Sequence, residues 1–394
     1  MTVSKQDRAL AIRFILCIGL VSLFADMTYE GAYSIIGPFL KDLGASAFAV
    51  GLIAGLGEMI AASLRFFSGR LVDRTRAYWT VAICGYFLNV MVIPAMAFAE
   101  NWPMLALLVV IERTGKSLRG PARDVLLSEA TSKIGHGWGF GVHAAMDQTG
   151  AVLGPLFVVA AVMQKHHFGP AFLRLAFPAV GALTALLIAR FVYPQAGKAT
   201  AKQGKTIALP KVFWWYVAAA GMLALGYADF PILAYHFQDL KLVGPAAIPL
   251  MYSGAMGVEG LAALIIGKLF DRYGIGMLSV GILISLAGLP LGFLGGQTAA
   301  IAAVACWAIG MGAQDACLRS GISQVVSMNK RGSAFGSFNG VFGIAWFLGS
   351  VTMGQLYGHS LIALVAFGAV AQLISAMMFF RLRAPLAEAA AAAA

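Results

Sequence analysis

The sequence has little charge. Only 11% of its 394 residues are charged, whereas 60% are hydrophobic, and soluble domains carry charge on about a quarter of their residues. A soluble chain of this length would need far more polar surface to cover a single core. The composition therefore excludes an ordinary cytosolic enzyme, a disordered chain and a nucleic-acid-binding protein. It predicts a polytopic protein that lies in the lipid bilayer.

The sequence also lacks the usual marks of metal and cofactor chemistry. Its four cysteines, Cys17, Cys84, Cys306 and Cys317, lie in apolar segments without metal-ligand spacing, so we expect neither a disulfide nor a metal site. It contains no phosphate-binding glycine loop, no nucleophile elbow and no HExxH motif. We therefore expect no enzyme, no ATP-driven pump and no bound cofactor; the proton gradient would drive any transport.

The hydrophobic residues form continuous runs of helical length. Strands of a membrane barrel alternate polar and apolar residues over about ten positions, whereas a helix needs about 20 apolar residues to cross a bilayer. We predict an all-α membrane protein with twelve transmembrane helices. The predicted spans are 12–38, 46–70, 78–99, 103–128, 138–163, 170–193, 212–238, 245–268, 276–295, 299–326, 334–357 and 360–382.

A hydrophilic stretch divides the chain near its middle. We predict an N-terminal six-helix bundle at 1–193, a cytoplasmic linker at 194–211, a C-terminal six-helix bundle at 212–383 and a flexible tail at 384–394. With both termini in the cytoplasm, 18 of the 28 basic residues fall on the cytoplasmic side and four on the other, as the positive-inside rule requires. We therefore expect a multi-pass protein of the bacterial inner membrane, acting as a monomer.

The two predicted bundles repeat one another. The segment from Gly69 to Arg74 (GRLVDR) matches the segment from Gly267 to Arg272 (GKLFDR) 198 residues later, and Ala25-Asp26 matches Ala228-Asp229 at an offset of 203. The drift between offsets indicates small loop insertions after an old duplication. Two parallel six-helix repeats around a central site are typical of one large transporter architecture.

These segments resemble those of a known family. The two Gly-x-Leu-x-Asp-Arg loops resemble the cytoplasmic signature of the major facilitator superfamily, and the resemblance covers essentially the whole chain. The run from Gly150 to Pro155 resembles the superfamily's antiporter motif, although Val158 and Val159 replace its trailing glycine pair. "ADMTYEGAYSIIGPFL" and "ERTGKSLRGPARD" resemble bacterial efflux-type members. The resemblance implies two pseudo-symmetric six-helix bundles and secondary active transport by alternating access.

The motif residues are candidates for gating. They are Gly69, Arg70, Asp73, Arg74, Asp124, Gly150, Gly154, Pro155, Gly267, Asp271 and Arg272. Gly69 would allow close approach of a helix or loop, and Asp73 would lie at the positive end of a neighbouring helix in a charged cytoplasmic latch. Asp271 would belong to a weaker mirror latch. Alternatively, the arginines only anchor the topology. The Gly150–Pro155 run would form a tightly packed, bendable helix face.

Ionisable residues inside the predicted spans carry most of the functional information. A charge in the middle of a bilayer is costly unless it is paired, hydrated or protonated. The candidates for binding substrate or protons are Asp26, Glu30, Tyr33, Glu58, Arg113, Asp229, Glu259 and Asp315. So large a set predicts an internal, partly hydrated cavity. Asp26 is the first choice because it is central and has a repeat partner, Asp229.

These acids have two candidate functional roles. The alternative to both is a structural ion pair. A carboxyl group in a low-dielectric cavity can take up and release a proton as access alternates, or it can bind a cationic substrate. The preferred function is proton-coupled antiport of a small amphipathic or cationic compound; its direction, export, is what the resemblance to efflux-type members and the Gly150–Pro155 motif imply. One alternative is uptake or exchange of an organic anion through Lys116, Arg119, Arg123 and Arg319, which an acidic midplane would disfavour. Another is transport of a metal ion or metal chelate by carboxylate ligands.

Overall fold

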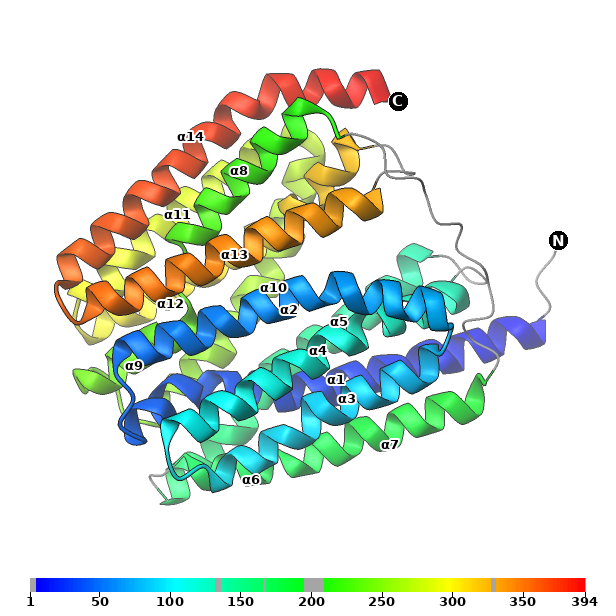
Figure 1. The fold of residues 1–394 in the computed structure, drawn as a ribbon, viewed down its shortest axis with the longest axis horizontal. Coiled ribbons are helices and arrows are strands. Elements are labelled where there is room, and N and C mark those ends of the chain that lie inside the picture. Colours follow the sequence, from blue (N-terminus) through cyan, green and yellow to red (C-terminus); the bar gives the residue numbers. More distant parts are fainter. Residues whose placement is uncertain (1–4, 132–135, 166–167, 195–208, 327–330, 394) are drawn as a thin grey trace. The chain divides into compact units, whose positions relative to one another are not determined.

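Figure 1 shows a computed structural model of the chain, in which residues 5–131, 136–165, 168–194, 209–326 and 331–393 are described. The described residues form helices and connecting turns, with no strand among them. The helices are α1 (Lys5–Asp42), α2 (Ala47–Thr75), α3 (Tyr78–Ala95), η1 (Met96–Phe98), α4 (Trp102–Thr131), α5 (His136–Lys165), α6 (Gly169–Arg174), α7 (Ala176–Val192), α8 (Lys211–Gly226), α9 (Phe230–Asp239), α10 (Ala247–Tyr273), α11 (Gly276–Leu294), α12 (Gln297–Val325), α13 (Arg331–Tyr357) and α14 (Leu361–Ala393).

Every predicted span falls in a helical segment. In the described part of the chain, eleven segments are long and apolar enough to cross a membrane. The remaining long helix is α4, whose 30 residues include the charged side chains of Glu112, Arg113, Lys116 and Arg119. The predicted fold class, an all-α membrane protein with two six-helix repeats, is confirmed.

Two predicted spans are interrupted. The sixth span consists of α6 and α7, which meet at Leu175, and the seventh consists of α8 and α9, which are separated by residues 227–229. Pro231 lies in the first turn of α9, after Asp229 in an extended conformation. Proline has no N–H to continue the preceding helix. A hydropathy window cannot detect this break, because the residues around it are as apolar as those of the helices.

The chain packs as two compact units. Unit 1 contains the described residues of 1–39, 64–202 and 245–253, and unit 2 contains those of 40–63, 203–244 and 254–394. Each unit therefore includes helix ends from the other half of the sequence: the first part of α2 packs in unit 2, and the start of α10 packs in unit 1. The linker predicted at 194–211 lies largely outside the described residues, so the domain boundaries stay a prediction.

Glycines bring α5 against α1 in unit 1. A Cβ atom on Gly150 would collide with the carbonyl oxygen of Leu23, and one on Gly154 would collide with that of Met27. The tight packing expected at both glycines is present, and Pro155 lies inside the same helix. Their role in gating stays a prediction.

The same packing recurs in unit 2. Gly349, which follows Gly154 at an offset of 195, brings α13 so close to α8 that a Cβ would collide with the carbonyl oxygen of Leu225. The first part of α2 also packs on α13: a Cβ on Gly55 would lie 2.9 Å from that of Ser350. The internal repeat is thus visible as a repeated helix contact.

Candidate functional site

The charged residues of α4 face the acids of α1 within unit 1. Arg113, Lys116, Arg119 and Arg123 follow one another at intervals of three or four residues, which places them along one face of α4. On α1, Asp26 and Glu30 are one turn apart. The sequence spacing therefore creates a basic face and an acidic face, and the packing of unit 1 brings them together.

Asp26 lies between a base and a second acid. Its Oδ1 is 3.2 Å from Nη2 of Arg119, and the side chains are 15% and 4% exposed respectively. The carboxyl group of Asp147, on α5, lies close enough to Asp26 to share a hydrogen bond. Oδ1 of Asp147 is buried and has no hydrogen-bond partner in the described part of the chain. Lys116 adds a more distant positive charge.

Glu30 is held by a tyrosine from α10. The hydroxyl group of Tyr252 donates to Oε2 of Glu30 at 2.7 Å, and Tyr252 is buried. Lys116, Arg113 and Asp26 also act electrostatically on the carboxyl group of Glu30. Glu30 therefore has one direct hydrogen bond and a mainly basic surrounding.

Tyrosine rings cover the bases of α4. Nζ of Lys116 lies 3.5 Å from the ring centroid of Tyr29, and the guanidinium carbon of Arg113 lies 4.9 Å from the same centroid. Arg113 also donates a hydrogen bond to the Tyr29 hydroxyl. Tyr33 stacks on Tyr29, with 5.8 Å between centroids. Such cation–π contacts keep a cation stable away from bulk water.

Glu112 forms an ion pair with Arg113, its neighbour on α4. Its Oε1 accepts a hydrogen bond of 2.5 Å from the amide of Asn89, and its Oε2 lies 3.4 Å from Nε of Arg113. Both members of the ion pair are nearly fully buried. His143, one turn before Asp147, is hydrogen-bonded to Ser22 at 2.7 Å.

Asp229 is surrounded differently from its sequence-repeat partner Asp26. It is buried at the break before α9, where Oδ1 accepts a hydrogen bond of 2.7 Å from Nε1 of Trp346 and Oδ2 accepts one from the hydroxyl group of Ser350. Both donors are uncharged, whereas Asp26 faces Arg119. The two aspartates match in sequence but not in chemistry, because one lies within a continuous helix and the other in a helix break.

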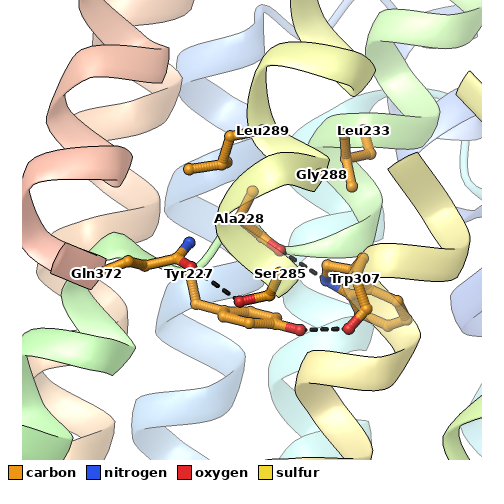
Figure 2. A pocket seen from close by; sticks show the side chains of 8 residues that line it. All are labelled: Tyr227, Ala228, Leu233, Ser285, Gly288, Leu289, Trp307 and Gln372. Carbon is orange, nitrogen blue, oxygen red and sulfur yellow. Dashed lines mark hydrogen bonds between the residues drawn. The ribbon is translucent and has the colours of Figure 1, made fainter. Parts of the chain in front are cut away.

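Side chains satisfy the backbone at this break. Nε1 of Trp307 donates to the carbonyl oxygen of Ala228 at 2.9 Å. The side-chain amide of Gln372 donates to the carbonyl oxygen of Gly226 at 2.9 Å. The Tyr227 hydroxyl donates to the carbonyl oxygen of Trp307. Figure 2 shows Tyr227, Ala228, Trp307 and Gln372 among the residues that line a cavity. The cavity has a volume of about 10 Å³, which is room for about one water molecule. The cavity is too small for a substrate.

The other candidate acids lie in unit 2. Glu58 on α2 and Glu259 on α10 are half-buried, and Asp315 on α12 is exposed. Glu259 and Asp315 both act electrostatically on Tyr227 at the helix break. A Cβ on Gly312 would lie 2.9 Å from that of Ala262, so α10 and α12 pack closely beside Glu259.

The candidate gating residues of the repeated loops show ordinary packing. A Cβ on Gly69 would lie 4.0 Å from Pro121, and one on Gly267 would lie 3.7 Å from Ala316. Among the described residues, Gly69 therefore faces α4 at normal van der Waals distance, and its role as a point of close approach stays a prediction.

The charged members of those loops fall into three groups. The side chains of Arg70 and Asp73 lie outside the described residues, so the latch stays a prediction. Arg74, Asp271 and Arg272 are exposed. Asp124, expected to join the latch, is 2.9 Å from Arg123, its own neighbour on α4.

Asn89 and Tyr252 are among the residues of the site that sequence reasoning missed. Asn89 was detectable in principle, because it is a lone amide in the apolar run of α3. Tyr252 was not, because only tertiary packing brings the start of α10 to Glu30. Among the described residues, no group of three or more His, Cys, Asp or Glu side chains is placed to hold a metal ion.

Comparisons with known proteins agree with this fold. The sequence model described as Major Facilitator Superfamily matches residues 17–350. An uncharacterized protein of Mycobacterium tuberculosis is 36% identical over 386 residues, which cover 95% of this chain and 94% of that protein. An MFS-type transporter of Methanocaldococcus jannaschii is 24% identical over 95% of this chain and 96% of its own length.

Weaker similarities extend to proteins with named functions. The multidrug resistance protein MdtH of Yersinia pestis is 27% identical over 168 residues, which cover 43% of this chain and 41% of that protein. The crystal structure of the nucleoside transporter NupG has a TM-score of 0.69 at 15% identity, covering 95% of this chain and 98% of that one. A bacterial homolog of the lysosomal transporter Spinster has a TM-score of 0.68 at 15% identity, covering 98% and 96%. The two structures support the fold alone.

Proposed function

Because the chain belongs to the Major Facilitator Superfamily, we propose that it is a proton-coupled transporter in which Asp26 and Asp147 share the transported proton. An ionised carboxylate can only accept hydrogen bonds, so two carboxyl groups can hydrogen-bond to each other only when one of them is protonated. The contact between Asp26 and Asp147 is the observation that carries the proposal.

Arg119 stabilises the pair of aspartates after the proton has been released. With the proton bound, the pair carries one negative charge opposite Arg119; with the proton released, it carries two, and Arg119 and Lys116 offset part of the excess. Exchange of the proton thus changes the local charge by one beside α1, α4 and α5. In an alternating-access cycle, that change can favour one orientation of the bundles over the other.

We propose export of a small amphipathic or cationic compound as the direction and substrate class. The Gly150–Pro155 run, which resembles the antiporter motif and packs tightly on α1, supports antiport. The partial similarity to a multidrug resistance protein supports an amphipathic substrate. We expect the protein to work in the bacterial inner membrane, with both termini in the cytoplasm and without a bound cofactor.

The charge balance of unit 1 favours a second candidate, exchange or uptake of an organic anion. The five acids Asp26, Glu30, Glu112, Asp124 and Asp147 lie beside the four bases Arg113, Lys116, Arg119 and Arg123. Five negative and four positive charges leave a net charge of −1, so binding of one proton makes the cluster neutral. The acidic midplane expected from the sequence is therefore largely offset in unit 1, and a protonated cluster would not repel an anion.

Two measurements test these functions in sequence. A thermal-shift screen with organic cations and organic anions identifies the class that stabilises the folded protein. A stabilising compound is then assayed in proteoliposomes with and without an imposed pH gradient. We expect a cation, with flux that the gradient drives in the direction opposite to protons. Stabilisation by anions alone supports the second candidate, and flux that is indifferent to the gradient contradicts proton coupling.

A further inference from the structure

Helix α10 passes from one unit to the other. Its residues 247–253 pack in unit 1, and residues 254–273 pack in unit 2. Two hydrogen bonds hold the first part: the Tyr252 hydroxyl donates to Glu30 at 2.7 Å, and the Ser253 hydroxyl donates to the carbonyl oxygen of Val152 at 2.8 Å. The rings of Tyr252 and Tyr33 also lie 5.9 Å apart. One acceptor, the carboxyl group of Glu30, can titrate. The other, the backbone carbonyl oxygen of Val152, cannot.

Glycines follow immediately at the junction. Among the described residues, a Cβ atom on Gly254 or Gly257 would meet no atom within 4 Å, apart from the helix's own backbone. Close packing therefore does not require glycine at either position, although glycine inside a helix costs about 0.5–1 kcal/mol relative to alanine. Glycine makes the backbone of α10 easier to bend where the helix passes from unit 1 to unit 2.

The strength of the Tyr252 contact depends on the charge of Glu30. A hydrogen bond to an ionised carboxylate is roughly twice as strong as one between neutral groups. The charged groups that face Glu30 are Asp26 on its own helix and Arg113 and Lys116 on α4; the titratable hydroxyl of Tyr252 faces it from α10. When Glu30 gains a proton, the bond from Tyr252 weakens, whereas the bond from Ser253 to Val152 does not change.

We propose that Tyr252 is a positioning residue that senses the charge of Glu30 and releases the start of α10 from unit 1 when Glu30 is protonated. The helix then bends at Gly254 and Gly257. Through this movement, proton binding among the acids of α1 reaches a helix whose remaining length belongs to unit 2. The inference rests on the proposed proton coupling, but it assigns the sensing step to Glu30 and Tyr252 rather than to Asp26 and Asp147.

Spin-label distances within unit 1 test this inference without a substrate. The labels replace two exposed leucines, as Leu250→Cys on α10 and Leu173→Cys on α6, in the full chain with its four native cysteines replaced, in lipid nanodiscs. We expect a narrow distance distribution at alkaline pH that broadens or shifts at acidic pH. Tyr252→Phe and Glu30→Gln should each give the acidic distribution at both pH values.

Ser253→Ala is the matched control, because it removes the neighbouring hydrogen bond to an acceptor that does not titrate. We expect it to keep the pH response. Asp26→Asn separates this inference from the proposed proton site. If the distance still changes with pH in Asp26→Asn but not in Tyr252→Phe or Glu30→Gln, Glu30 is the sensor. That conclusion holds even where transport assays show that Asp26 does not carry the proton. A pH response that survives in Tyr252→Phe, or a wild-type distance that does not change with pH, overturns the inference.

Discussion

At the scale of single residues, Asp229 lies buried at the break between α8 and α9. Its two oxygens accept hydrogen bonds from Trp346 and Ser350 in a buried environment. Removing a donor leaves part of a buried charge unsatisfied, which costs about 1–3 kcal/mol or more. An amide at this position can keep both contacts, since its oxygen accepts from Trp346 and its NH2 group can donate to the Ser350 hydroxyl.

Trp346→Phe should therefore lower the free energy of unfolding by about 1–3 kcal/mol, and Asp229→Asn should lower it by less. Thermal unfolding of both variants in the same detergent measures the difference. A larger loss in Asp229→Asn than in Trp346→Phe would mean that the negative charge of Asp229, rather than its hydrogen bonds, stabilises the break between α8 and α9.

At the scale of helices, the glycines divide into two classes that the sequence does not distinguish. Gly150 and Gly349 lie where a Cβ would collide with a backbone carbonyl oxygen of the neighbouring helix, whereas Gly69 and Gly267 have normal space. A carbonyl oxygen of a packed helix cannot move aside as a flexible side chain can. The effect of adding one methyl group should therefore differ between the two classes.

Gly150→Ala and Gly349→Ala should each destabilise the protein by about 1–3 kcal/mol through overpacking. Gly69→Ala and Gly267→Ala should leave stability unchanged or raise it by up to about 1 kcal/mol, the gain expected for alanine within a helix. Midpoints of thermal unfolding for the four variants decide this. Equal destabilisation in both classes would contradict the described helix contacts.

Hydropathy predicted the helices well and their interruptions poorly. Each run of about 20 apolar residues forms a helical segment, because the backbone must satisfy its own hydrogen bonds within a bilayer. The break at residues 227–229 depends on Trp307 and Gln372, which come from distant parts of the chain and donate to the backbone carbonyl groups of Ala228 and Gly226. Likewise, the spacing of Asp26 and Glu30 predicted a shared face, but only packing supplies Asp147 and Tyr252 as their partners.

At the scale of the whole molecule, the sequence repeat and the packing divide the chain at different positions. The repeat divides the sequence near its middle, yet residues 40–63 pack in unit 2 and residues 245–253 pack in unit 1. Helices α2 and α10 therefore each contribute to both units. The acids beside α4 have basic partners, whereas Trp346 and Ser350, which donate to Asp229, are uncharged.

The central claim is that Asp26 and Asp147 share one proton, and infrared difference spectroscopy tests it most directly. The C=O stretch of a protonated carboxyl group is resolved from that of a carboxylate, and the protein needs no substrate for the measurement. At neutral pH we predict a protonated-carboxyl band that loses the same intensity in Asp26→Asn and in Asp147→Asn, because either substitution leaves a single acid beside Arg119, and that is unchanged in Glu58→Gln. A band whose intensity neither aspartate substitution lowers, or the absence of the band from the wild type, would contradict the shared proton.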